Sequence, residues 1–425
     1  MLRCLTTKCS AKLAVAAGAL ALCAALVAPA QAQDKMPIKI GFGIAETGPL
    51  GPNGKSALLA MQIWVEQTNA KGGLLGRQVQ LVHYDDQSNP STVPGIYTKL
   101  LDVDKVDLIV GGYGTNLLAP AMPIVMQKKK VFLGLYGLGV NHDFKYDRYF
   151  AMIPSGPEPT TSFTKGFFDT AMAQNPKPTS VALVAADAEF SKNACDGARV
   201  NAKAAKLKIT YDKSYPPSTA DFAPIVRAIQ AGNPDLVVIC SYPLDSVGMV
   251  QAVNEAGLKP KMIGGAMVGL QSTVFKTKLG PLLNGFMNYD FWLPAKSMMF
   301  PGTAEFLKTY QERAAKAGVD PLGYYMAPFG YAYLDVLGQA VAATKSLDDT
   351  KLAEHFRKTT FKTIVGDVAF GKNGEWAKSR VFQAQFRGIK GNGVDQFKNP
   401  DTLAIITPVE YKSGDVIYPY EKARQ

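Results

Sequence analysis

Short, largely apolar segments alternate along the chain with longer segments of helical pattern. In the first half of the chain the short segments predict strands at 38–44, 79–83, 106–110 and 131–135, and the longer ones predict helices at 56–70, 94–103 and 117–127. Strands that are apolar along their whole length are typical of a parallel sheet with helices on both faces. This half of the chain therefore predicts a doubly wound α/β lobe.

The same pattern then repeats. Strands are predicted at 181–184, 209–211, 236–240 and 262–264, with helices at 192–206, 222–232 and 246–257. Further helices are predicted at 304–317, 327–345 and 352–359, and strands at 381–387 and 403–406. A second doubly wound lobe follows from this repeat.

Two segments, 149–154 and 288–294, are predicted to cross between the lobes. We expect one lobe to comprise 37–154 plus 295–362 and the other 155–294 plus 363–425, joined by a multi-segment hinge. Open α/β sheets bind ligands at the carboxyl ends of their strands, so two facing sheets predict a cleft that closes on a ligand.

The N-terminus predicts export. Arg3, Lys8 and Lys12 precede an uncharged apolar run at 13–28, and Ala30-Gln31-Ala32 fits the pattern that signal peptidase cleaves. We expect a signal peptide at 1–32 and a periplasmic product. An uncleaved anchor and a lipoprotein cleaved at Cys23 are the alternatives, but the lipoprotein signal needs a small residue where Leu22 stands.

Composition is that of an ordinary globular protein, with 47% hydrophobic residues. The formal charge is +11, and loss of the leader's three basic residues leaves about +8. These charges are scattered, which favours solubility and adds a weak field for anionic solutes. Recognition motifs for nucleic acid are absent, so no nucleic-acid partner is expected.

The cysteines and histidines of the chain indicate no metal site and do not settle whether a disulfide forms. Cys195 and Cys240 remain after the leader, and export permits a disulfide, but sequence alone leaves their pairing open. The three histidines are far apart in sequence, and no metal-ligand spacing occurs.

Catalytic motifs are incomplete. The segment 41–46 (GFGIAE) lacks the third glycine of a dinucleotide fingerprint, and Pro49 stands where a phosphate-binding loop begins with glycine. A Ser-x-x-Lys at 162–165 lacks its companion motifs. We therefore expect neither enzymatic activity nor a cofactor.

The segment Gly111-Gly112-Tyr113-Gly114-Thr115-Asn116 is more informative because it follows a buried strand and opens a helix. Glycine lets the backbone approach a solute closely, and Thr115 can either cap the helix or donate its hydroxyl to a ligand. The turn at 135–139, which includes Tyr136, Gly137 and Leu138, follows the next strand and reaches the same sheet edge. Backbone amides at such an edge favour a carboxylate.

Six segments resemble the type I periplasmic binding proteins of the leucine/isoleucine/valine-binding family. They are IAETGPLG at 44–51, NAKGGLLG at 69–76, YDDQSNP at 84–90, VGGYGTNLLAP at 110–120, DFAPIVRA at 221–228 and AGLKPK at 256–261. The resemblance implies a monomeric protein that captures a small ligand and delivers it to the permease subunits of an ABC transporter. A ligand-sensing receptor module is the alternative role, since the same fold serves both.

The resemblance also implies ligand-binding positions. Thr115 matches the hydroxyl residue that holds the ligand carboxylate, and Gly137 matches a backbone contact after the fourth strand. Phe190 matches an aromatic residue that covers the ligand, and Tyr242 lies at or beside a second aromatic position.

Three positions depart from the amino-acid binders. Leu138 stands where a second hydroxyl is expected, Ala266 where a carboxylate pairs the ligand ammonium, and Asn53 near a frequent aromatic position. A buried ammonium without a partner costs several kcal/mol.

The predicted ligand is therefore a small carboxylate without an ammonium, with an aromatic or other apolar body. Aromatic residues that could surround it are Tyr113, Tyr136, Phe190, Tyr242, Tyr324 and Tyr325. Uptake of hydrophobic or branched-chain amino acids is the alternative, in which Asp245 or Glu189 replaces the missing acid.

Overall fold

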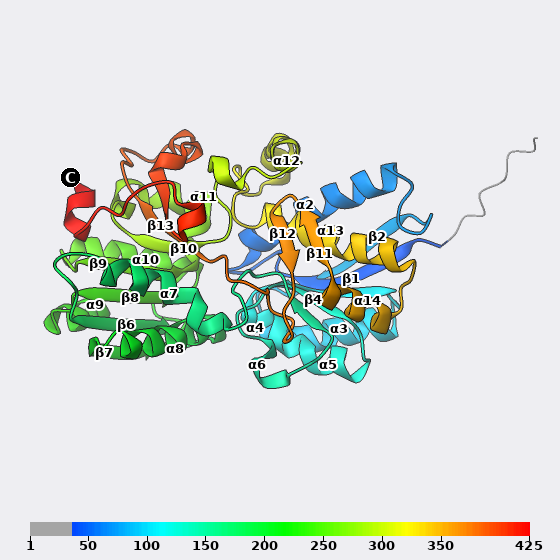
Figure 1. Ribbon diagram of the computed structural model, residues 1–425, viewed down its shortest axis with the longest axis horizontal. Helices are drawn as coiled ribbons and strands as arrows, with labels where there is room; N and C mark the ends of the chain where they lie inside the picture. The colour runs from blue at the N-terminus through cyan, green and yellow to red at the C-terminus, as the bar shows by residue number, and fades with distance from the viewer. Residues whose placement is uncertain (1–35) are drawn as a thin grey trace, which may run out of the picture. The chain divides into compact units, whose positions relative to one another are not determined.

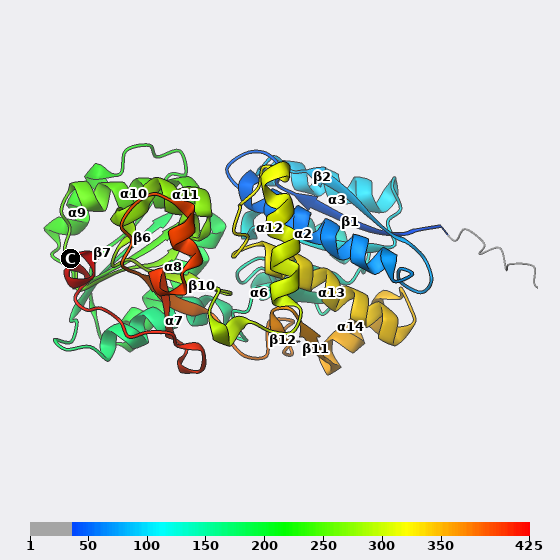
Figure 2. The same ribbon diagram turned by 90° about the horizontal axis from the view of Figure 1, so that it is seen from above.

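The structure is a computed structural model that describes residues 36–425, so the predicted signal peptide lies outside the described residues. From Ile38 to Gln425 the chain forms one compact unit. Two sheets, each with helices on both faces, make up its two lobes (Figures 1 and 2). The predicted fold class, α/β with two doubly wound lobes, is confirmed.

The first sheet has five strands among the described residues, in the order β2-β1-β3-β4-β5, all parallel. They are β1 (Ile38–Ile44), β2 (Val79–Asp85), β3 (Leu108–Tyr113), β4 (Phe132–Tyr136) and β5 (Tyr149–Ala151). The first four were predicted from apolar runs. The predicted crossing segment at 149–154 begins as the edge strand β5, because its backbone pairs with β4 before the chain leaves the lobe.

The second sheet has seven strands among the described residues, in the order β14-β13-β10-β9-β8-β6-β7. They are β6 (Ser180–Ala186), β7 (Lys208–Tyr215), β8 (Leu236–Ser241), β9 (Met262–Met267), β10 (Met287–Asp290), β13 (Phe382–Phe386) and β14 (Leu403–Thr407). The strands from β7 to β10 are parallel, and β13 and β14 extend the sheet in antiparallel pairing.

Seven helices of the described chain belong to the first lobe. They are α2 (Gly51–Ala70), α3 (Val93–Asp102), α4 (Thr115–Leu118), α5 (Met122–Gln127), α6 (Asn141–Phe144), α13 (Ala327–Thr344) and α14 (Asp349–Lys358). Pro52 in its first turn lets α2 start earlier than predicted. The helix predicted at 117–127 is divided into α4 and α5, because Pro120 and Pro123 disrupt continuous helical hydrogen bonding.

The second lobe carries five helices within the described residues. They are α7 (Pro159–Met172), α8 (Glu189–Ala204), α9 (Ala223–Ala231), α10 (Pro243–Glu255) and α11 (Thr273–Leu279). Alternate residues of β6 enter different cores: Val181 and Leu183 pack with side chains of α7 and α8, while Ala182 and Val184 pack with those of α9 and α10. This alternation buries both faces of the sheet at β6, which explains why that strand is almost entirely apolar.

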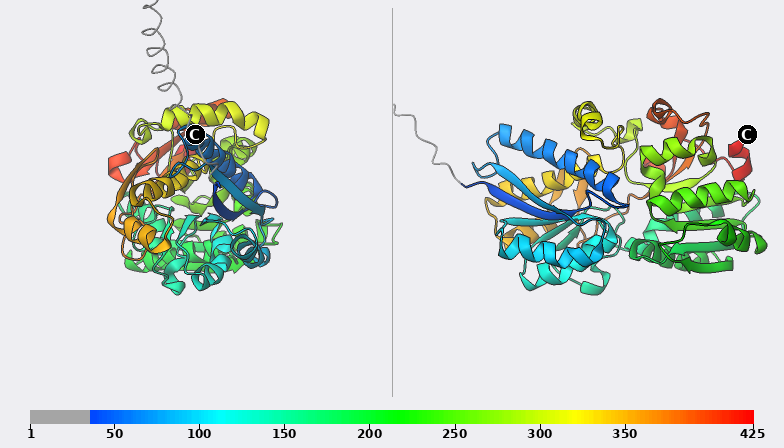
Figure 3. Two further views of the ribbon diagram at one scale, coloured as in Figure 1. Left: turned by 90° about the vertical axis from the view of Figure 1, so that its right-hand side faces the viewer. Right: turned by 180° about the vertical axis from the view of Figure 1, so that it is seen from behind.

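The chain crosses between the lobes three times in the described region, after β5, after β10 and before β13. The second crossing leads to α12 (Thr303–Ala317), which packs on α2 (Figures 2 and 3). A hydrogen bond between the hydroxyls of Ser56 and Tyr310 (2.6 Å) joins the two helices. A small hairpin of β11 (Thr360–Thr363) and β12 (Gly366–Ala369) precedes the third crossing. The lobe boundaries predicted from the sequence stay a prediction.

The structure pairs Cys195 with Cys240, a question that the sequence left open. Cys195 lies on α8 and Cys240 on β8, and their Cα atoms are 6.1 Å apart, within the ordinary range for a disulfide. The bridge therefore fastens α8 to the middle of the second sheet.

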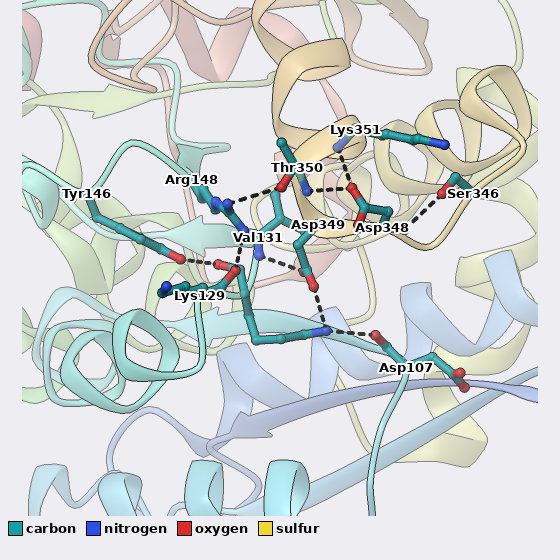
Figure 4. Close-up of polar contacts among 11 residues, drawn as sticks. Asp107, Lys129, Val131, Tyr146, Arg148, Ser346, Asp348, Asp349, Thr350 and Lys351 are labelled. Carbon is teal, nitrogen blue, oxygen red and sulfur yellow. Dashed lines mark hydrogen bonds and ion pairs between the residues drawn. The ribbon is translucent and has the colours of Figure 1, made fainter.

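A polar network fastens α14 to the amino end of β4 (Figure 4). The Asp349 carboxylate accepts from the Val131 amide (2.8 Å) and from Lys130 Nζ (2.8 Å). Lys130 Nζ also donates to the carbonyl of Asp107 (3.1 Å), and the Asp348 side chain caps α14. The network lies at the opposite end of β4 from Tyr136, which is the strand's last residue.

Candidate functional site: the cleft between the lobes

The carboxyl ends of strands from both sheets meet at a small cavity. The first lobe contributes Leu50, Tyr113, Gly114, Thr115, Tyr136, Leu138, Ile153 and Tyr325, and the second contributes Phe190, Tyr242, Val268 and Tyr289. The cavity volume is about 20 Å³. That is room for roughly one water molecule, because the side chains of the two lobes nearly fill the space.

Seven of the nine residues predicted for the site line this cavity: Tyr113, Gly114, Thr115, Tyr136, Leu138, Phe190 and Tyr242. Gly137 does not line it, and a Cβ at that position would meet side chains of Leu118 and Val140 within 2.7 Å. Ala266 is fully buried in β9, and Val268, two residues further on, lines the cavity instead.

Thr115 is positioned by the turn that ends β3. Gly114 has a φ of 111°, a conformation that favours glycine, and Thr115 then opens α4. The Thr115 hydroxyl oxygen accepts from the Leu138 amide at 3.0 Å. Because that bond uses the oxygen as an acceptor, the hydroxyl proton is left to donate to another group.

Aromatic side chains dominate the lining. Within the first lobe, the ring of Tyr136 lies 6.3 Å from that of Tyr113 and 5.5 Å from that of Tyr325. Within the second, the ring of Phe190 lies 5.9 Å from that of Tyr242 and 6.1 Å from that of Tyr289. Burial raises the pKa of Tyr113 to about 12, so its hydroxyl is neutral at physiological pH.

The tyrosine hydroxyls at the cavity differ in their hydrogen-bond partners. Tyr113 OH accepts from the side-chain amide of Asn53 (3.0 Å), and the hydroxyls of Tyr289 and Tyr325 lie 3.2 Å apart. Tyr136 OH is buried and has no hydrogen-bond partner among the described residues. Asn53 thus supports the lining from α2 without lining the cavity itself.

Charged side chains are absent from the described lining of this cavity. Asp245 and Glu189, the acids expected to replace the one missing at Ala266, line a neighbouring space instead. Asp245 accepts from Tyr215 OH (2.7 Å) and from the Tyr242 amide (3.1 Å). Burial raises the pKa of both carboxyls.

That neighbouring space, called here the mouth chamber, has a volume of about 750 Å³ and is lined by both lobes. Leu50 and Tyr242 line both the cavity and the mouth chamber. These two side chains therefore form a wall that the two spaces share.

Four lining residues were not found from the sequence: Leu50, Ile153, Val268 and Tyr289. Tyr289 and Val268 lie at or just beyond the carboxyl ends of β10 and β9, and their place at the cavity depends on where β9 ends and on which strand lies beside it. Tyr324, which was expected near a ligand, does not line the cavity; its ring packs against Trp292 at 5.5 Å.

The lobes contact each other across the cleft. The Asn193 side-chain amide on α8 donates to the carbonyl of Leu138 at 2.8 Å. Tyr242 OH donates to Asn116 Oδ1 at 3.3 Å. The cleft in this structure is therefore closed, and a ligand of more than a few atoms requires these contacts to open or the lining to rearrange.

The described residues include neither a candidate membrane span nor a candidate metal site. The helices between residues 36 and 425 include none that is both long and apolar enough to cross a bilayer. No group of three or more His, Cys, Asp or Glu side chains in that part of the chain is arranged to hold a metal ion.

Comparison with known proteins identifies relatives over most of the chain. A family model described as "Periplasmic binding protein" matches residues 37–392. The "Leu/Ile/Val-binding protein homolog 7" of Brucella abortus (strain 2308) is 26% identical over 330 residues, which cover 76% of this chain and 80% of the relative.

Solved structures show the same fold. The isoleucine complex of a branched-chain amino acid transporter substrate-binding protein from Streptococcus pneumoniae has a TM-score of 0.70 at 17% identity, covering 90% of this chain and 100% of that one. A solute-binding protein of an ABC transporter from R. palustris, in complex with 4-hydroxybenzoate, has a TM-score of 0.70 at 18% identity, covering 90% and 98%.

Proposed function

The chain belongs to the type I periplasmic binding proteins, in the leucine/isoleucine/valine-binding family of ABC-transporter solute-binding proteins, and from this we propose that it captures a small aromatic or otherwise apolar carboxylate. The ligand binds in the cavity between the lobes and is delivered to the permease subunits of the transporter. The chain acts as a periplasmic monomer after cleavage of residues 1–32, without a cofactor and without catalytic turnover.

The observation that carries this proposal is the lining of the cavity: six aromatic rings, one threonine hydroxyl, and no charged side chain among the described lining residues. An α-ammonium group in such a place would lose its water without gaining an acidic partner, at a cost of several kcal/mol. An aromatic body instead gains apolar contact and favourable ring packing.

Thr115 is the proposed anchor for the ligand carboxylate. Its oxygen is occupied by the Leu138 amide, so its proton can be donated to a carboxylate oxygen. Such a charge-assisted bond contributes about 1.5–3 kcal/mol. Tyr136 OH, buried and without a partner among the described residues, is the proposed second donor.

The structural neighbours fit this ligand class as well as the amino acids. The R. palustris neighbour was crystallised with 4-hydroxybenzoate and the S. pneumoniae neighbour with isoleucine. The apolar lining of the described cavity favours the first class for this chain.

A thermal-shift screen of protein that has been unfolded, dialysed and refolded to remove ligand tests the proposal. Benzoate, 4-hydroxybenzoate and 3-phenylpropanoate should raise the unfolding temperature by mass action. Leucine, isoleucine and valine should not. Shifts with the branched-chain amino acids alone would overturn the proposal and assign ordinary amino-acid uptake.

Amino-acid uptake is retained as a second candidate because of one observation. Asp245 and Glu189 line the mouth chamber next to the shared wall, where an acid could reach an ammonium if Tyr242 moved. Sensing instead of transport is distinguished by the neighbouring genes: permease and ATPase genes indicate transport, and a kinase gene indicates sensing. A turnover assay on each bound ligand tests the expected lack of catalysis.

A further inference from the structure

We infer that the mouth chamber is a second ligand subsite. It receives the far end of a ligand whose carboxylate is held at Thr115, and this far end is an apolar spacer that terminates in an ammonium or another hydrogen-bond donor. The inference rests on the proposed function and extends it: the transported ligand is an elongated aryl carboxylate with a distal donor group.

The position and size of the chamber support this inference first. Its volume of about 750 Å³ lies within the usual range of ligand pockets, about 300–1,000 Å³. Residues of both lobes line it, so a ligand bound there is held by the same lobe closure as a ligand in the cavity. It shares the wall formed by Leu50 and Tyr242 with the cavity.

Within the shared wall, the Tyr242 side chain is held by long hydrogen bonds. The hydroxyl of Tyr242 donates to Asn116 Oδ1 at 3.3 Å and accepts from the Phe190 amide at 3.3 Å. The first distance is longer than the 2.5–3.0 Å usual for a hydroxyl donor. Rotation of the Tyr242 side chain is therefore the movement by which the proposed subsite would open to the cavity.

The surface of the chamber fits an apolar spacer. Leu50, Phe222, Leu244 and Val247 contribute apolar side chains to the lining. Leu244, on α10, is 60% exposed. Covering this surface with a methylene chain gains about 0.8 kcal/mol per buried CH₂ group in transfer measurements, roughly a fourfold gain in affinity.

The charges of the chamber favour a donor at the end of that spacer. Its lining includes three acidic side chains, Asp187, Glu189 and Asp245, against one basic side chain, Lys278. Asp187 is paired with Lys192 (2.5 Å) and Asp245 with Tyr215. The Glu189 carboxylate has no hydrogen bond or ion pair recorded among the described residues, and its pKa is raised by partial burial.

A matched ligand series tests the subsite. We would titrate ligand-stripped protein with 4-alkoxybenzoates of two to six carbons, each ending in either a methyl or an ammonium group, and with benzoate as the short reference. Affinity should rise with chain length, and the longest ammonium-ended compound should bind three- to tenfold more tightly than its methyl-ended partner.

Variants separate the subsite from the cavity. Ala220 is exposed in the chamber lining, so Ala220→Trp fills the chamber without disturbing a core. It should weaken the longest ligands at least tenfold and change benzoate affinity less than twofold. Ala315→Trp, at an exposed position on α12, is the matched control and should change neither. Glu189→Gln should remove the preference for the ammonium end.

The outcomes are distinguishable. If benzoate binds but affinity falls with every added carbon, the subsite is refuted while the proposed function stands. If A220W weakens long and short ligands equally, the chamber is not a subsite. If leucine binds and benzoate does not, the proposed function itself is refuted. Tight binding of the long ligands that A220W abolishes and A315W preserves supports the subsite.

Discussion

The two ends of strand β4 illustrate two different uses of polar groups. At the amino end, Asp349 accepts two hydrogen bonds and Lys130 donates two, so both side chains have partners within the lobe. At the carboxyl end, Tyr136 OH is buried without a partner among the described residues. Buried polar groups are normally paired, so an unpaired one needs an explanation.

The difference fits the proposal that the amino end holds the fold together and the carboxyl end binds a ligand. Pairing at the amino end supplies stability, and changes there should lower the free energy of unfolding without altering ligand affinity. The hydroxyls at the carboxyl end are available to a ligand, so changes there should weaken ligand affinity more than they lower the free energy of unfolding. Four variants follow in order of decreasing effect on stability: the first measures a contact in the second lobe, and the other three test this division.

The largest effect is expected from the disulfide of the second lobe. Cys195 and Cys240 are separated by 45 residues, and closing a loop of that length restricts the unfolded chain by about 4 kcal/mol in the chain-entropy model. The double variant Cys195→Ala, Cys240→Ala should lose a comparable amount in urea unfolding. Ligand affinity should stay within twofold, and an unchanged unfolding midpoint would show that the bridge does not form.

The next effect is expected at the amino end of β4. Asp349→Ala removes an acceptor from a mostly buried amide and from Lys130, whose side chain is only 18% exposed. Chemical denaturation should show a loss of about 2 kcal/mol. Asp147→Ala, an exposed acid with no recorded partner in the described chain, is the control and should cost less than 0.5 kcal/mol. A weakened ligand affinity in a folded D349A protein would break the division.

Thr115→Ala tests the carboxyl end. Loss of a hydrogen bond to a charged group, about 1.5–3 kcal/mol, should weaken binding of the ligand ten- to a hundredfold. Stability should fall by only about 1 kcal/mol, because the Leu138 amide loses one acceptor. Thr115→Ser keeps the hydroxyl and should bind within a few-fold of the native protein. Equal affinity in the alanine variant would make Thr115 a helix cap and nothing more.

Tyr136→Phe should have the smallest effect on the stability of the protein. Its hydroxyl has no partner among the described residues, so removing it should leave stability unchanged or raise it by up to about 1 kcal/mol. Affinity for the carboxylate ligand should fall by about ten- to a hundredfold, because the hydrogen bond lost is one to a charged group. A clear loss of stability would mean that this hydroxyl is bonded in the folded protein.

Much of this structure follows from local pattern. The strands that the apolar runs predicted form, and the turn after β3 places Tyr113, Gly114 and Thr115 at the cavity, because the carboxyl edge of a parallel sheet is fixed by strand direction. What failed depended on register or distance. Whether position 266 or 268 faces the cavity depends on where β9 ends, which no local signal sets.

Features made by distant segments were also beyond the sequence. Tyr289 reaches the cavity only because β10 lies beside β9, a pairing between separate parts of the chain. The approach of Cys195 to Cys240 depends on the packing of α8 on β8 in the same way.

Helix α7 was missed because its first turn is rich in threonine, which weakens the helical pattern.

A calorimetric comparison of phenylalanine with 3-phenylpropanoate on ligand-stripped protein tests the central claim most directly. The two ligands share the ring, the spacer and the carboxylate, and differ in the α-ammonium group alone. We expect 3-phenylpropanoate to bind at least a hundredfold more tightly, because the described cavity lining offers no acid to the ammonium. Tighter binding of phenylalanine would contradict this and place an acidic partner for the ammonium within reach of the cavity.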